Sequence, residues 1–184
     1  VKDLEGYAFG STAFNAGKVL MQDHTFFASS ASWVLNAHIL QQQALRAADP
    51  SATFEVGPVG ALAEASVFVL STRLTRELLE KKAWLPLGVL VGLLRQLFTF
   101  LDEMGRFGDE PTREAASIIQ RQVFYEQEIL ALMKGLIEAY EPHNMQASYM
   151  ADCAVMTHAV LRQLEGYGGL VLKKKKGKKK GKKK

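Results

Sequence analysis

The feature that most constrains the fold is segment 87–104, which is apolar on every side when drawn as a helix. Its apolar side chains are Val89, Leu90, Val91, Leu93, Leu94, Leu97, Phe98, Phe100 and Leu101. A helix without a polar face has to be covered by other elements on several sides. We therefore expect this segment to be the central helix of the fold.

Five further segments carry apolar residues at intervals of three and four, which predicts helices at 26–48, 61–83, 111–125, 126–140 and 145–164. No segment has the alternating pattern of a strand, and the connections are short, so the fold is predicted to be all-α. Antiparallel helices joined in this way favour an irregular α-solenoid of HEAT or armadillo type. A closed bundle is the alternative.

The chain is expected to have three parts. Residues 1–25 contain several glycines and no sustained helical period, so they are predicted to be an irregular segment. Residues 26–172 form the helical-repeat domain. Residues 173–184 form a lysine-rich tail, which is predicted to be disordered because like charges repel and nothing apolar is available to bury.

The inward faces of the first two helices follow from their apolar spacing. In 26–48 the predicted buried side chains are Phe27, Ala31, Val34, Ala37, Leu40, Ala44 and Leu45. In 61–83 they are Leu62, Ala65, Val69, Leu70, Leu74, Leu78 and Leu79.

The corner after the central helix, at 105–110, is predicted to be structural. Gly105 and Gly108 are expected to take positive φ angles, and Asp109 to cap the next helix. Two acidic pairs flank this corner, Asp102 with Glu103 and Asp109 with Glu110. We expect them to cap helices and face solvent instead of forming a catalytic pair.

The charge is divided unevenly along the chain. There are 23 basic and 19 acidic residues, a formal net charge of +4. Ten of the basic residues are tail lysines: Lys173, Lys174, Lys175, Lys176, Lys178, Lys179, Lys180, Lys182, Lys183 and Lys184. The rest of the chain therefore carries 13 basic against 19 acidic residues, a net charge of −6.

This lysine tail predicts a nuclear import signal, a sequence-independent phosphate-binding arm, or a feature that only aids solubility or expression. In the helical part the only local concentration of basic residues is Arg73, Arg76, Lys81 and Lys82.

No catalytic, cofactor or metal site is expected. Asp152, Cys153 and His158 share one helix, but Cys153 and His158 are five residues apart and diverge around it, so structural roles are predicted. The remaining histidines have no second ligand at three or four residues.

A single cysteine and no apolar run of about 18 residues predict a soluble intracellular protein.

Four segments resemble motifs of the Timeless family of replication-fork proteins. Segment 101–110 is similar to a "D-x-M-x-x-S-G-D-E" turn, with Phe107 at a position where the family more often has a small polar residue. Segment 118–126 is similar to "I-x-x-N-I-F-Y-E", with Gln122 in place of Asn. Segment 140–142 is similar to "S-Y-K-P", and 157–165 to "T-H-x-x-L-R-x-L-E".

The resemblance implies a late part of the family's N-terminal helical domain, within a longer nuclear protein that has no catalytic activity. Its implied partners are a Tipin-type small subunit, the replicative helicase with other fork proteins, and duplex DNA, with no membrane. Together they protect and pause replication forks and support the replication checkpoint. The alternatives are a generic HEAT-like interaction adaptor and a cytosolic helical enzyme with its site outside this sequence.

Overall fold

The computed structural model describes residues 21–126 and 129–166, and this part of the chain contains helices and no strand. The all-α prediction is confirmed. The helices are α2 (Met21–Ala48), the short 3₁₀ helix η2 (Gly57–Ala63), α3 (Ala65–Glu80), α4 (Trp84–Phe107), α5 (Glu110–Glu126), α6 (Ile129–Glu138) and α7 (Ala147–Gly166). Residues 1–20 and the whole lysine tail lie outside the described residues.

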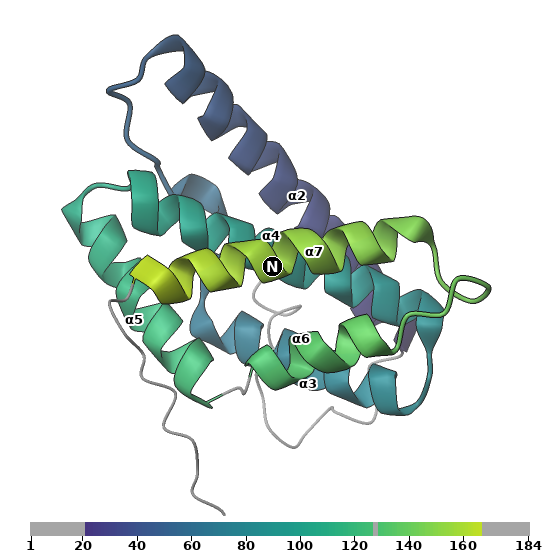
Figure 1. Ribbon diagram of the computed structural model, residues 1–184. Coiled ribbons are helices and arrows are strands. Elements are labelled where there is room, and N and C mark those ends of the chain that lie inside the picture. Colours follow the sequence, from purple (N-terminus) through teal and green to yellow (C-terminus); the bar gives the residue numbers. More distant parts are fainter. Residues whose placement is uncertain (1–20, 127–128, 167–184) are drawn as a thin grey trace, which may run out of the picture.

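Helix α4 is the centre of the fold, as its apolar sequence predicts. It packs against α2, α3, α5 and α7, and side chains such as Leu87, Leu94 and Leu97 are completely buried. Figure 1 shows α7 running alongside α4, with α6 and α3 below them in this view. By length and composition α4 could also span a membrane. Four neighbouring helices bury α4, as expected for the core helix of a folded domain.

The helices are arranged around α4, and the solenoid arrangement stays a prediction. Helices α2 and α7 both pack on α4 (Figure 1). Helix α3 contacts α4 and also both α5 and α6, and α6 contacts α7.

The corner after α4 differs from its prediction in one respect. Helix α4 continues through Gly105 to Phe107, and Gly108 has a φ of −68°, so the predicted positive φ angles are wrong. Gly108 is needed for space: a Cβ there would lie 2.5 Å from the carbonyl oxygen of Met104. The predicted cap is confirmed, since the backbone N–H of Thr112 donates to Asp109 Oδ1 at 3.0 Å.

Helix α2 begins at Met21, five residues before the predicted start, and buries a different face from the predicted one. The buried residues are Ala28, Ala31, Leu35, Ile39 and Gln42. Of the predicted set, Ala31 is buried and Phe27 half-buried, while Val34, Ala37, Leu40, Ala44 and Leu45 are exposed. Helix α2 has apolar residues on more than one side, so its contacts with other helices determine which side is buried. The amide of Gln96 on α4 donates to Asn36 Oδ1 at 2.9 Å.

Helix α3 also turns a more polar face inward than predicted. It begins at Ala65, after η2, and its buried residues are Val67, Phe68, Ser71, Thr72, Thr75 and Leu78. The other apolar residues of the predicted face are half-buried. The hydroxyl of Thr75 donates to the carbonyl of Ser71 at 2.7 Å, so this hydroxyl is buried without losing a partner.

Candidate functional site

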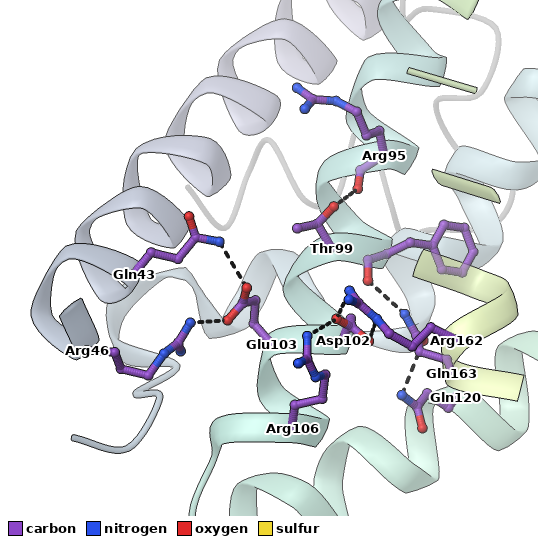
Figure 2. A network of polar contacts seen from close by, with 11 residues as sticks. Gln43, Arg46, Arg95, Thr99, Asp102, Glu103, Arg106, Gln120, Arg162 and Gln163 are labelled. Atoms are coloured by element: carbon purple, nitrogen blue, oxygen red, sulfur yellow. Dashed lines mark hydrogen bonds and ion pairs between the residues drawn. The ribbon is translucent and has the colours of Figure 1, made fainter. Parts of the chain in front are cut away.

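The most distinctive polar feature of the described chain is a pair of buried carboxylates in the last turns of α4. Asp102 and Glu103 are 2% and 7% exposed, so the expectation that they face solvent beside a turn is wrong. The reason is that α4 extends past them, which places both between neighbouring helices. Successive residues of a helix point about 100° apart. Glu103 therefore faces α2 and Asp102 faces α7 (Figure 2).

Glu103 connects α4 to α2. Its Oε1 accepts a hydrogen bond of 2.9 Å from the amide of Gln43, and its Oε2 accepts one from Arg46 Nη2. The guanidinium of Arg46 also lies 3.9 Å from the centre of the Phe107 ring, which favours its positive charge. Two polar side chains of α2 thus satisfy one buried carboxylate.

Asp102 connects α4 to α7. Arg162 on α7 donates through both Nε, at 3.2 Å, and Nη2, which is the two-pronged contact of a guanidinium with a carboxylate. Arg106, one turn further along α4, adds a longer ion pair at 3.6 Å. Next to this pair the amide of Gln163 donates to the carbonyl of Phe98 at 2.9 Å. Gln120 on α5 donates to Gln163 Oε1 at 3.2 Å (Figure 2).

Beside Asp102 lies a cavity of about 460 Å³, which we call the arginine cavity. Its lining comes from α4, α5 and α7 and consists of Asp102, Gly105, Arg106, Arg113, Ser117, Gln120, Arg162 and Gln163. Three arginines and one aspartate give this lining a net charge of two positive. The arginine side chains are 39% to 48% exposed, so their guanidinium groups are accessible from solvent.

The predicted basic residues of the folded part lie on α3 and in the turn after it. Lys81 pairs with Glu77 on the surface of α3, and this hydrogen bond lowers the pKa of Glu77. Lys82 sits in the turn after α3 with a φ of 54°, and Arg73 is exposed. This group does not line the arginine cavity.

Cys153 is buried and His158 is exposed, as expected for two side chains that diverge around one helix. Cys153 is 1% exposed, and burial raises the pKa of its thiol to about 11, so it is protonated at neutral pH. Burial also raises the pKa of Asp152, which pairs with Arg95 at 2.8 Å. His158 is exposed. Within the described ranges no three His, Cys, Asp or Glu side chains are grouped as metal ligands.

Neither the arginine cavity nor the contacts around it are predicted by the sequence pattern. One feature of the sequence could have indicated this site: two carboxylates stand at the end of an otherwise apolar helix. Acidic residues buried in such a helix require polar partners. The partners on other helices lie 57 to 60 positions away in the chain. Three of the four motif segments meet here: Asp102 comes from the first, Gln120 from the second and Arg162 from the fourth.

The fold and this cluster define an all-α helical unit whose polar side chains hold helices together. No family model matches the chain. It is similar to a protein named Topoisomerase 1-associated factor 1 from Chaetomium globosum, with 26% identity over 157 residues, 83% of this chain and 12% of that protein. A protein of the same name from Phaeosphaeria nodorum is 29% identical over 146 residues, 74% of this chain and 12% of that protein.

A human protein named Protein timeless homolog is 31% identical over 85 residues, which are 44% of this chain and 7% of that protein. These distant relatives support the resemblance to the Timeless family that the four motifs indicate. The chain spans about 12% of the length of the fungal relatives.

Proposed function

We propose that this chain is a non-catalytic helical scaffold of Timeless type that acts in the nucleus at replication forks. In this role it belongs to a fork protection complex with a Tipin-type small subunit, contacts the replicative helicase, and supports fork pausing, the replication checkpoint and DNA repair during the cell cycle. The observation that carries the proposal is the similarity to Topoisomerase 1-associated factor 1 over 83% of the chain.

The structure supports a scaffold role through the motif segments. Their polar residues pair with one another across helices. Asp102 is held by Arg162, and Cys153 is a buried, protonated thiol. Polar residues that pair across helices fix the relative positions of those helices. A scaffold needs such fixed positions to present a constant surface to several partners.

Duplex DNA is the proposed ligand of the lysine tail. The rest of the chain has a net charge of −6 and repels phosphate, whereas ten lysines attract it without reading bases. Replacing the ten lysines with glutamine in the full chain should abolish duplex binding and nuclear import. Binding by the natural chain should be independent of DNA sequence and fall steeply with salt. Unchanged binding after replacement would instead assign it to Arg73, Arg76, Lys81 and Lys82.

The replication role is tested in cells with the natural full-length protein, tagged at its own locus. We expect nuclear fluorescence, and recovery of the helicase and a small partner after nuclease treatment has removed DNA bridges. Loss of the protein should increase fork stalling and weaken the checkpoint response. A cytoplasmic protein recovered without any replication factor would contradict the proposal and favour the generic adaptor.

An exposed apolar surface on α2 favours that adaptor as the second candidate. Phe26 and Trp33 are 75% and 72% exposed, and Leu40 is 55% exposed. These residues are seven apart, so they lie along one side of the helix. An exposed apolar stripe of this kind is typical of a surface that packs against another helix.

A further inference from the structure

We propose that the arginine cavity binds an acidic side chain, a carboxylate or a phosphorylated residue, that a partner protein presents on a peptide. The proposal does not depend on the replication role, because it rests only on the residues around the cavity. Its basis is the convergence of Arg106, Arg113 and Arg162 from three different helices on one hollow.

The charges of these arginines are only partly neutralised. Asp102 pairs with both Arg162 and Arg106, and Glu110 pairs with Arg113 at 2.6 Å from outside the lining. Three guanidinium groups thus face two carboxylates, one of which, Glu110, has a side chain 83% exposed and screened by water. A surplus of positive charge remains in the hollow and attracts an anion.

The side chains of the arginine cavity are also held in position before any ligand binds. Asp102 is buried and fixes Arg162 through two hydrogen bonds, so this guanidinium loses little freedom when it binds a ligand. Gln120 and Gln163 are buried beside it and hydrogen-bonded to each other. Guanidinium groups bind carboxylate and phosphate with two parallel hydrogen bonds, which makes these anions the fitting ligand class.

Size and charge favour a peptide over a nucleic acid. About 460 Å³ accommodates one acidic side chain together with neighbouring atoms of the chain that carries it. The body around the cavity has a net charge of −6, so it repels a polyanion such as duplex DNA. A single anion on an otherwise neutral peptide experiences the local positive charge with little of this repulsion.

The test uses the full chain and three fluorescent peptides of neutral composition that differ at one position, which is phosphothreonine, glutamate or glutamine. Binding is followed by fluorescence anisotropy at physiological ionic strength, and by the NMR signals of the arginine Nε–H groups. We expect the phosphothreonine and glutamate peptides to bind and to shift the signals of Arg106, Arg113 and Arg162. The glutamine peptide should not bind.

The variant Arg106→Gln/Arg113→Gln should weaken binding about tenfold or more, because it removes two of the three positive charges that would contact the anion. Arg121→Gln is the matched control. Arg121 is exposed on the same helix as Arg113 but does not line the cavity, and the lysine tail is the same in both proteins. Circular dichroism confirms that each variant is folded.

Several results would overturn the proposal. Equal weakening by Arg121→Gln, or binding without shifts of the three arginine signals, would assign the peptide to the tail or the general surface. Equal binding of the glutamine peptide would show that charge is not recognised. If a short DNA duplex bound and shifted the three signals while neither acidic peptide did, the cavity would be a nucleic-acid site.

Discussion

Removing Arg162 should destabilise the fold strongly, because it leaves a carboxylate buried without its main partner. The side chain of Asp102 is 3% exposed, and Arg162 supplies two of its contacts. Breaking a buried ion pair from one side typically costs about 3 to 5 kcal/mol. Arg106 stays 3.6 Å away and the Arg162 side chain is 39% exposed, so water and a second cation reduce the loss. We expect Arg162→Met to cost about 3 kcal/mol.

The reverse change should cost less, and this asymmetry is the sharper part of the prediction. Asp102→Asn keeps an oxygen acceptor for Arg162, whose guanidinium can also be hydrated. The expected loss is about 1 kcal/mol. In the double variant no buried charge is left unpaired, because the remaining Arg106 is 46% exposed, so its cost should be smaller than the sum of the two single changes. A coupling energy of about 2 kcal/mol is expected.

The measurement is urea unfolding of the full chain, followed by far-UV circular dichroism, with the slope of the transition compared among variants. Arg113→Met is the control, since its pair with the exposed Glu110 should contribute less than about 0.5 kcal/mol. The prediction is refuted if Arg162→Met lowers the free energy of unfolding by no more than the control variant does. It also fails if the two single changes are additive, because then Asp102 and Arg162 are not coupled.

Three other predictions follow from burial and hydrogen bonding. Leu35→Ala should cost about 2 to 5 kcal/mol, while Trp33→Ser on the exposed side of α2 should change the free energy of unfolding by less than about 0.5 kcal/mol; equal losses would contradict the observed face. Hydrogen bonds from Thr112 lower the pKa of Asp109, so the ionised carboxyl stabilises the fold. Asp109→Ala should therefore be less stable than the natural chain at neutral pH, and this difference in the free energy of unfolding should disappear as acid protonates the carboxyl. A difference that stays constant across pH would refute the prediction. Cys153 should react with a maleimide reagent far more slowly in the native chain than in urea, and rapid native labelling would disprove its burial.

The parts of the fold that were predictable depend on local sequence. Helix α4 was identified because its apolar residues surround it, which requires a central position whatever its neighbours are. The Asp109 cap was identified because it involves a residue only three positions away. The lysine tail lies outside the described residues, so its predicted role stays a prediction.

The parts that were not predictable depend on contacts between distant segments. Helix α2 has apolar residues on more than one side, so its own sequence does not decide which side is buried. The contacts that distinguish the faces include Gln96 with Asn36 and Glu103 with Gln43, each pair separated by 60 positions. Polar residues are the hardest to place in this way, because their burial depends on partners that periodicity does not reveal.

The same contacts explain why α4 retains costly carboxylates at its end. An apolar helix packs on its neighbours with many nearly equal rotations and shifts, because dispersion and burial are weakly directional. A carboxylate bound by a guanidinium permits far fewer rotations and shifts. On α4, Asp102 is directed at α7 and the next residue, Glu103, is directed at α2. We infer that Asp102 and Glu103 set the rotation of α4 between its two neighbours. The spacing of the arginines around the cavity, and with it any ligand selectivity, depends on that rotation.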